Sequence, residues 1–393
     1  MTRDEPVLIV GGGIAGLATA LALARHGIPS RILEQRELFS EAGAGIQLGP
    51  NGVRVLEMLG VAPHLRAHVS VPEEIVVHQG ANGRVLTRMP LGNWIAERHG
   101  APYWVAHRRD LQAALLETAR ATSGITIETG FAVAEIADRG DHVEIRAASG
   151  AVARGPVLIG ADGIRSRVRA ALAPDTQLRF SGKAASRALL TPDAALPLGD
   201  PSSMGVWLAP GAHVVHYPVA AGAQIAVVAI VPDNRMTDDW AAANDWSALE
   251  PHLTAFAPAL RAVLATASEW RRWALFETDP LAHFANGRIA IAGDAAHPML
   301  PFLAQGGVMA LEDALVLAEM LATHRDDPSG ALKAYERARQ PRVNAVVAMS
   351  RQNGRIFHLA GPAALARNLA MTTLPAARLM ARYDWVYGWR PPV

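Results

Sequence analysis

Three short apolar runs divide the chain into a repeated pattern of strand, glycine-containing turn and helix. The runs are residues 6–10, 157–159 and 288–292, and apolar residues at helical spacing follow each turn. Between the second and third runs lie strand-like segments separated by short Ala- and Gly-containing turns, at 204–208, 213–219 and 224–231. The pattern predicts an α/β protein with an inserted antiparallel meander.

The first strand–helix junction fits the spacing G-x-G-x-x-G at Gly11, Gly13 and Gly16. These glycines allow, in turn, a tight turn, backbone approach to a pyrophosphate, and close packing of helix on strand. The helix N-terminus offers free N–H groups and its positive dipole end to phosphates. Glu34 ends the next strand, eighteen residues after Gly16, and is placed to bind a ribose. The context predicts a dinucleotide site; the alternative is a tight turn that binds nothing.

Other residues near loops and helix starts are candidates for the same ligand. Arg36 would lie near an adenosine phosphate or ribose, although a solvated surface charge explains it equally well. Arg108 opens a helix and is placed to reach a phosphate; the alternative is an ordinary basic first turn. Gln47 is a candidate ligand contact from a loop, with a satisfied loop amide as its alternative. Asn51 is expected to cap the helix that ends at residue 60.

Two further junctions carry an aspartate beside glycine. The second apolar run leads into Asp162 and Gly163, and the third leads into Asp294. A buried aspartate at the end of a central strand is well placed to accept a ribityl or ribose hydroxyl. Gly306 and Gly307 open a long helix, where backbone N–H groups can approach an acceptor closely. Three such junctions therefore lie far apart in sequence, with a β-rich insert between the second and third.

The middle strand of the insert carries candidate chemistry on one face. His213, Val215 and Tyr217 share that face because side chains alternate along a strand. His213 and Tyr217 are about 13 Å apart along the strand, so their side chains can converge on a ring above Val215. The alternative is an exposed His213 and a core Tyr217.

Composition narrows the possible classes of partner. The 393 residues carry 37 Lys+Arg against 36 Asp+Glu, a net charge of +1, so we expect no nucleic acid partner. With no cysteine, disulfides, zinc–thiolate sites and Cys nucleophiles are excluded, and we expect no metal site. No apolar stretch suits a membrane span, and a strand begins too early for a signal peptide, so we expect a cytoplasmic protein, monomeric or homodimeric.

Three motifs in order resemble those of the single-component flavoprotein aromatic hydroxylases, the FAD monooxygenases of the 4-hydroxybenzoate hydroxylase fold. They are Gly11-x-Gly13-x-x-Gly16 with Glu34, Gly160-Ala-Asp162-Gly163, and Gly293-Asp294-Ala-Ala-His297-Pro298 continuing to Glu312-Asp313-Ala314. The resemblance covers nearly the whole chain. Segments 42–51, 107–111 and 383–388 look most like salicylate 1-hydroxylases, 3-hydroxybenzoate 6-hydroxylases and 6-hydroxynicotinate 3-monooxygenases. The last group carries His at the positions of Gln47 and Phe302, which argues against a pyridine substrate.

The resemblance implies a Rossmann-like FAD-binding domain with an inserted antiparallel-sheet substrate domain and C-terminal helices. The FAD domain is expected over 1–71, 101–179 and 281–345, the substrate domain over 72–100 and 180–280, and the helices over 346–393. FAD is expected to bind tightly and without a covalent bond. The expected cofactor contacts are Gly11, Gly13, Ala15, Gly16, Glu34, Arg36, Gln47, Arg108, Asp162, Gly163, Asp294, Gly306 and Gly307.

The implied reaction hydroxylates a salicylate- or hydroxybenzoate-like phenolic ring with O₂, using NADH or NADPH as a transient electron donor and a flavin C4a-hydroperoxide. The family's substrate-activating His and Tyr fall on His213 and Tyr217. In the insert, Arg187 is a possible partner for a carboxylate. The substrate pocket is expected to be apolar and lined by Met204, Val215, Leu300, Pro301 and Phe302.

Two alternatives stay open. One is an FAD monooxygenase of the same fold that acts on a hydroxypyridine, purine, quinone precursor or polyketide. The other is a non-catalytic dinucleotide-binding protein.

Overall fold

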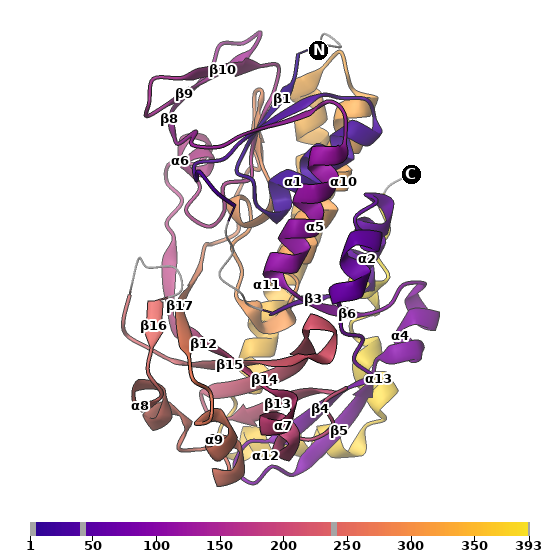
Figure 1. The fold of residues 1–393 in the computed structure, drawn as a ribbon, viewed down its shortest axis with the longest axis vertical. Helices are drawn as coiled ribbons and strands as arrows, with labels where there is room; N and C mark the ends of the chain where they lie inside the picture. The colour runs from indigo at the N-terminus through magenta and orange to yellow at the C-terminus, as the bar shows by residue number, and fades with distance from the viewer. Residues whose placement is uncertain (1–4, 40–44, 237–241, 392–393) are drawn as a thin grey trace.

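The computed structural model describes residues 5–39, 45–236 and 242–391. Its strands form two main sheets, one in the upper half of Figure 1 and one in the lower half, with long helices running between them. The upper sheet has the order β18 (Ala285–Asn286), β19 (Ile289–Ile291), β11 (Leu158–Gly160), β1 (Val7–Val10), β2 (Ser30–Leu33) and β7 (Ile125–Glu128). All neighbours pair in parallel except β18 and β19.

The lower sheet is mostly antiparallel and joins two separate stretches of the chain. Its order is β16 (Ala242–Asn244), β17 (Trp270–Glu277), β12 (Arg179–Leu190), β15 (Gln224–Pro232), β14 (Ala212–Val219), β13 (Met204–Ala209), β4 (Glu74–Gln79) and β5 (Val85–Pro90). The β13–β4 pair alone is parallel in this sheet. The meander expected from the pattern is confirmed as β13, β14 and β15. The α/β class with an antiparallel insert is therefore confirmed.

The remaining strands form two smaller sheets. They are β10 (Val152–Gly155), β9 (Val143–Ala147) and β8 (Val133–Asp138) in one sheet, and β3 (Gly45–Leu48) with β6 (Trp104–His107) in the other. Gln47 therefore lies in a strand and not in the loop expected for it. Residues 42–44 of the neighbouring family-like segment lie outside the described residues.

Helices α1 (Ile14–Arg25) and α10 (Gly306–Thr323) pack against each other beside the parallel sheet and are buried along most of their length. Their Ala- and Leu-rich sequences suit such burial because a helix that is apolar all round must be covered on all sides. Helix α11 (Pro328–Phe357) then runs from the upper half to the lower half in Figure 1. It places its C-terminal end against the antiparallel sheet.

The other helices cover the edges of these layers. They are α2 (Pro50–Met58), α3 (Ala62–Leu65), α4 (Gly92–His99), α5 (Arg108–Ala121), α6 (Arg167–Leu172), α7 (Pro192–Ala195), α8 (Trp246–Leu249), α9 (Pro258–Leu264), α12 (Gly361–Thr373), α13 (Ala376–Ala381) and α14 (Asp384–Tyr387). Short 3₁₀ turns are η1 (Arg66–His68), η2 (Leu196–Leu198), η3 (Ala220–Gly222), η4 (Glu250–Leu253), η5 (Gly293–Ala295) and η6 (Pro301–Leu303). Within the described ranges, every helix is too short or too polar to cross a bilayer.

The expected cap at Asn51 is wrong. Helix α2 begins at Pro50 after Gly49, and Asn51 lies inside its first turn without a capping hydrogen bond. Its amide instead donates to Gln305 Oε1 at 3.0 Å and to Glu312 Oε1 at 2.8 Å. Both partners are buried acceptors. A buried acceptor that lacks a donor costs more free energy than an uncapped helix N-terminus, so the Asn51 amide binds these acceptors and does not cap α2.

Candidate active site

The glycine-rich turn after β1 has the geometry that its sequence predicts. Gly11 has a φ of +103°, and a Cβ there would lie 2.4 Å from the carbonyl oxygen of Ala161. A Cβ on Gly16 would lie 1.9 Å from the oxygen of Gly11. A Cβ on Gly13 would meet nothing within 4 Å, so the start of α1 is open for a phosphate to approach. Ala15 faces the other way and packs on Gly293.

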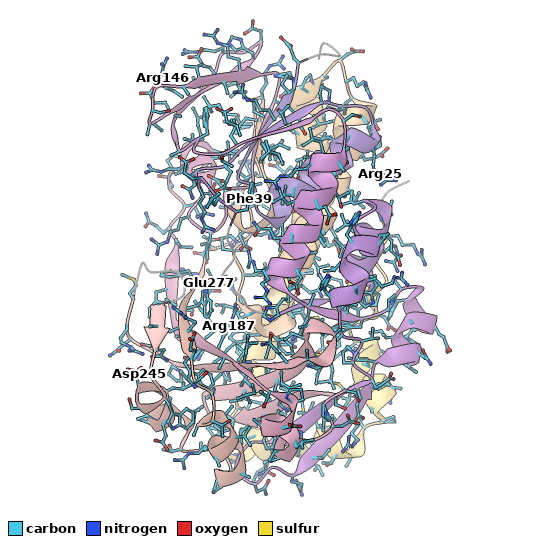
Figure 2. All side chains as sticks on the ribbon, in the orientation of Figure 1. Arg25, Phe39, Arg146, Arg187, Asp245 and Glu277 are labelled. Atoms are coloured by element: carbon cyan, nitrogen blue, oxygen red, sulfur yellow. The ribbon has the colours of Figure 1, made fainter. Side chains whose placement is uncertain are left out.

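Glu34 lies at the end of β2, beside this turn. Its carboxylate accepts the backbone N–H of Gly12 at 2.7 Å and that of Arg36 at 3.0 Å. The ring of Phe39, labelled in Figure 2, lies against Gly12. The exposed Arg36 is adjacent, so Glu34 and Arg36 lie where the ribose of a dinucleotide would follow its pyrophosphate.

Asp162 and Gly163 occupy the second junction, and the Asp162 carboxylate caps helix α6. Ser166 Oγ donates to its Oδ1 at 2.5 Å, and the backbone N–H groups of Arg167 and Val168 donate to Oδ2 at 2.7 and 3.2 Å. Burial raises the pKa of Asp162, and these hydrogen bonds oppose that rise. Gly163 has a φ of +78° and open space around it. Asp162 therefore shapes the turn, while the Gly163 backbone stays accessible.

The third junction lines a cavity between the two sheets, which we call the flavin-side cavity. Asp294, Gly306, Gly307 and Arg108 form part of one wall. The Asp294 carboxylate has no hydrogen-bond partner among the described residues, and its Oδ1 lies 3.9 Å from where a Gly306 Cβ would be. An open acceptor beside a helix N-terminus fits a cofactor that carries hydroxyl groups and a polar ring edge.

The opposite wall of the flavin-side cavity comes from the antiparallel sheet and includes Arg187, Val215 and Tyr217. Figure 2 shows Arg187 at the level where the two halves of the molecule meet. Its guanidinium lies 4.6 Å from the centre of the Trp273 ring, and its buried Nε has no hydrogen-bond partner within the described chain. Burial lowers the pKa of Arg187, partly offset by Tyr217.

Tyr217 is held against β3. Its hydroxyl donates to the carbonyl oxygen of Gly45 at 3.3 Å, and a Cβ on Gly45 would lie 2.2 Å from the Tyr217 ring. Burial raises the pKa of Tyr217, and the Arg187 charge opposes the rise. Tyr217 therefore stays a neutral phenol that can donate or relay a hydrogen bond.

His213 is buried on the same face of β14, which excludes the exposed alternative for this residue. Its Nδ1 lies 2.8 Å from Nε2 of His358. Burial, reinforced by His358 and Lys183, lowers the pKa of His213 well below its usual value. The imidazole is therefore neutral at physiological pH and can accept a proton.

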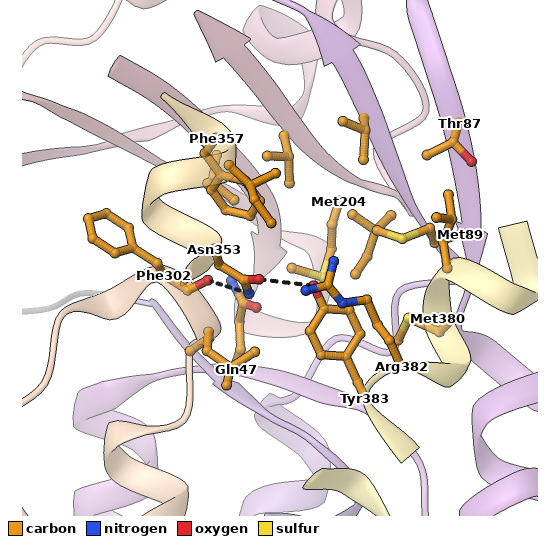
Figure 3. Close-up of a pocket in the computed structure, with 18 of the residues that line it drawn as sticks. Gln47, Thr87, Met89, Met204, Phe302, Asn353, Phe357, Met380, Arg382 and Tyr383 are labelled. Atoms are coloured by element: carbon orange, nitrogen blue, oxygen red, sulfur yellow. Dashed lines mark hydrogen bonds between the residues drawn. The ribbon is translucent and has the colours of Figure 1, made fainter. Parts of the chain in front are cut away.

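A second cavity, which we call the inner cavity, lies between the antiparallel sheet and the C-terminal helices (Figure 3). Met204 and Phe302 belong to its predominantly apolar lining. Its polar residues include Asn353, whose amide donates to the Phe302 carbonyl oxygen at 3.3 Å and accepts from the Tyr383 hydroxyl at 3.5 Å. The two cavities share the residues Gln47, His213, Val215, Pro301 and Ala304. We call these five residues the shared wall.

Most of the expected pocket residues come together here, with one difference. Leu300 lines neither cavity; its side chain packs in a small cluster with Ala185, Ile230 and Phe302. Gln47 is on the shared wall, and its Oε1 accepts a hydrogen bond from the Tyr103 hydroxyl at 2.7 Å. The sequence search missed Tyr103, Asn353 and His358. A tyrosine in a short apolar run and polar residues near a helix end carry no local signal of a site.

His216 points to the opposite face of the sheet. It packs over Gly205 and beside Trp207, and its Nε2 is buried without a partner in the described structure. Burial, with a smaller effect of His78, lowers the pKa of His216 to about 3. Of the two histidines on β14, His213 lines both cavities described above, whereas His216 lines neither.

Comparisons with known proteins identify the family of this chain. The FAD binding domain family matches residues 4–350. A 3-hydroxybenzoate 6-hydroxylase of Polaromonas naphthalenivorans is 34% identical over 98% of this chain and 96% of its own. A 3-amino-4-hydroxybenzoate 2-monooxygenase of Streptomyces platensis is 36% identical over 99% and 97%.

Among solved structures, Klebsiella pneumoniae HpxO complexed with FAD and uric acid matches with a TM-score of 0.85 and 25% identity, over 96% of this chain and 95% of that one. A glycine turn open to a phosphate, and a cavity aspartate whose carboxylate has no hydrogen-bond partner among the described residues, fit the same cofactor. The chain therefore belongs to the FAD binding domain family and is a flavoprotein monooxygenase of the aromatic hydroxylase type.

Proposed function

We propose that this enzyme hydroxylates a phenolic acid of the hydroxybenzoate class. The observation that carries the proposal is the pairing, in one cavity, of a buried neutral imidazole with a guanidinium whose buried Nε has no hydrogen-bond partner among the described residues. A phenol needs a base to remove its proton before hydroxylation, and a carboxylate needs a cation to bind it in a buried site. A hydroxybenzoate supplies both groups on one small ring, and two relatives are named for hydroxybenzoate substrates.

In the proposed reaction, His213 accepts the phenol proton and so makes the ring electron-rich. Arg187 binds the carboxylate, and its contact with Trp273 holds the guanidinium plane in place. Tyr217 orients the phenol oxygen as a neutral donor. Val215 and Pro301 on the shared wall exclude water. FAD, once reduced by NADH or NADPH, supplies the activated oxygen from O₂.

We propose the cofactor contacts as well. Gly13, with the start of α1, would hold the pyrophosphate, and Glu34 the adenosine ribose. Asp294 would bind a ribityl hydroxyl or diphosphate group, and the N–H groups of Gly306 and Gly307 would contact the isoalloxazine edge. The other contacts proposed are Gly11, Gly16, Arg36, Gln47, Arg108, Gly163, and the backbone groups of Ala15 and Asp162.

A urate-like purine is the second candidate substrate, because HpxO complexed with uric acid has the same fold. The apolar lining of the inner cavity, with Met204, Met89 and Phe302, favours a benzenoid ring, since a purine presents polar atoms around its edge. Gln47 and Phe302, in place of the histidines of 6-hydroxynicotinate enzymes, argue against a hydroxypyridine.

The test is substrate-dependent NAD(P)H oxidation by the FAD-loaded enzyme, with product identification. The panel is 3-hydroxybenzoate, salicylate, 6-hydroxynicotinate and urate. We expect rapid, coupled oxidation with a hydroxybenzoate and slow or uncoupled oxidation with the two heterocycles. Coupled hydroxylation of urate or 6-hydroxynicotinate alone would refute the assignment.

We also propose that the enzyme works in the cytoplasm, where NAD(P)H is regenerated, as a monomer or homodimer. The near-zero net charge of +1 supports a small-molecule enzyme without a nucleic acid partner. Light scattering of the purified holoenzyme tests the oligomeric state, and a larger assembly would contradict it.

A further inference from the structure

His213 is paired with a second histidine that the proposed reaction has not used. His358 lies at the C-terminal end of α11, and its Nε2 is 2.8 Å from Nδ1 of His213. The two residues are 145 positions apart in sequence. His213 is almost fully buried, whereas His358 is half-buried and so has a face toward solvent. The pair therefore links the shared wall of the cavities to the outside of the protein.

The surroundings of this pair disfavour a charge on His213. Phe302 and Phe357 pack against its ring, with centroid distances of 5.5 and 5.3 Å. The charged groups that act on the pair are cations, Lys183 on β12 and Arg367 on α12. Because an imidazolium there would be both desolvated and repelled, a proton taken from the substrate has to be passed on.

Only one of the two facing nitrogens can carry the proton of this hydrogen bond. If Nδ1 of His213 donates to Nε2 of His358, then Nε2 of His213 keeps its lone pair for the cavity. Nε2 of His213 has no hydrogen bond within the described residues, which suits that tautomer. The contact therefore sets which nitrogen of His213 faces a substrate.

We propose that His358 is the positioning residue and proton acceptor for His213, completing a two-histidine relay from the substrate to solvent. The relay rests on the proposed function. The phenol O–H bond breaks as an N–H bond forms at Nε2 of His213. The Nδ1–H of His213 breaks as an N–H forms at Nε2 of His358, and Nδ1 of His358 gives its proton to water. The tautomers reset when the product oxygen takes a proton back by the reverse path.

His358 is suited to this task because it is neutral when it must accept. Burial, with Lys183 and Arg367, lowers its pKa to about 4. Above that pH its Nε2 lone pair is available. Arg367 itself donates to the carbonyl oxygens of Ile356 and Phe357, so it also holds the end of α11 that carries His358.

The test follows proton transfer directly in the FAD-loaded enzyme, without turnover. Rapid mixing with 4-hydroxy-3-nitrobenzoate, whose phenolate is yellow, is done at a pH low enough that the free ligand is a neutral phenol, and measures how fast the bound phenol ionises. Two variants are compared with wild type: His358→Gln, which keeps a hydrogen bond but cannot relay a proton, and His358→Ala. We expect both to slow ionisation by about a hundredfold or more, in the usual 10²–10⁴-fold range of proton-transfer catalysis. Added imidazole should restore the rate of His358→Ala.

The matched control is His324→Gln, because His324 is the C-cap residue of α10 as His358 is of α11. Its ionisation rate should equal that of wild type, and the flavin spectrum and melting temperature of every variant report folding. Wild-type rates in His358→Gln and His358→Ala would overturn the relay, as would a slow His358→Ala that imidazole fails to rescue. Failure of wild type itself to ionise or hydroxylate phenolic acids would instead overturn the proposed function.

Discussion

Arg339 donates from Nε to Asp313 Oδ1 at 2.7 Å, and both side chains are almost completely buried. Asp313 also accepts from His297 Nε2 at 2.5 Å and from the backbone N–H of Gly293 at 2.9 Å. Burial by itself would raise the pKa of Asp313, but His297 and Arg339 reverse that effect and hold it well below its usual range. The pair therefore anchors the turn that carries Asp294 into the flavin-side cavity.

Arg339→Met should destabilise the protein by about 3–5 kcal/mol, because it removes the guanidinium that lies between the buried carboxylates of Glu312 and Asp313. Urea unfolding followed by circular dichroism measures the loss. Arg337→Met, an exposed position on the same helix, is the control and should change stability by less than about 0.5 kcal/mol. Equal effects of the two substitutions would show that the buried pair contributes nothing particular.

Asp294→Ala and Glu34→Ala should each weaken FAD binding by about 1.5–3 kcal/mol, the usual worth of a hydrogen bond to a charged acceptor. Fluorescence titration of the apoprotein with FAD measures the dissociation constant. Asp326→Ala, at an exposed position after α10, should bind FAD as wild type does. Wild-type affinity in both site variants would remove these residues from the cofactor site.

His213→Ala and Tyr217→Phe should slow hydroxylation by about 10²–10⁴-fold, the range of general acid–base catalysis. FAD binding should persist because neither residue belongs to a dinucleotide motif, and NADH oxidation should uncouple to release hydrogen peroxide. Product and peroxide yields at saturating 3-hydroxybenzoate decide the matter. Full coupling at the wild-type rate would leave both side chains with a purely structural role.

Arg187→Met should weaken binding of 3-hydroxybenzoate by about 1.5–3 kcal/mol and leave binding of 3-methylphenol nearly unchanged, because only the first ligand has a carboxylate. Changes in flavin absorbance on titration measure both affinities. Arg179→Met, an exposed position on the same strand β12, is the control. An equal loss for the two ligands would mean that Arg187 only maintains the shape of the cavity.

His216 should make the protein less stable in acid. Its pKa in the fold is about 3, against about 6.5 in the unfolded chain, so the unfolded state binds an extra proton between these values. Its contribution is complete above pH 6.5 and is lost as the pH falls toward 3. In His216→Leu, the drop in unfolding free energy from pH 8 to pH 5 should shrink by about 2 kcal/mol. Urea unfolding at both pH values measures it, with His324→Leu as the unaffected control.

Local sequence patterns were sufficient to predict the helices and strands named below and the glycine-rich turn. An apolar run followed by Gly11, Gly13 and Gly16 predicts a strand, a tight turn and a helix, because backbone freedom and apolar periodicity act over a few residues. The meander that carries His213 and Tyr217 on one face follows from the two-residue repeat of a strand. These features depend on neighbours in sequence, so the chain determines them directly.

Tertiary structure alone decided which distant side chains meet. Asn51 does not cap its helix but donates a hydrogen bond to Glu312, which is 261 residues away in sequence. His358 lies within hydrogen-bond distance of His213, which is 145 residues away. The sequence by itself also could not show that Leu300 would line neither of the two cavities, or that Arg187 Nε would have no hydrogen-bond partner in the described part of the chain. Burial sets these outcomes: in a dry interior each polar group must find its partner wherever the packed helices and sheets bring one, and no local pattern encodes that place.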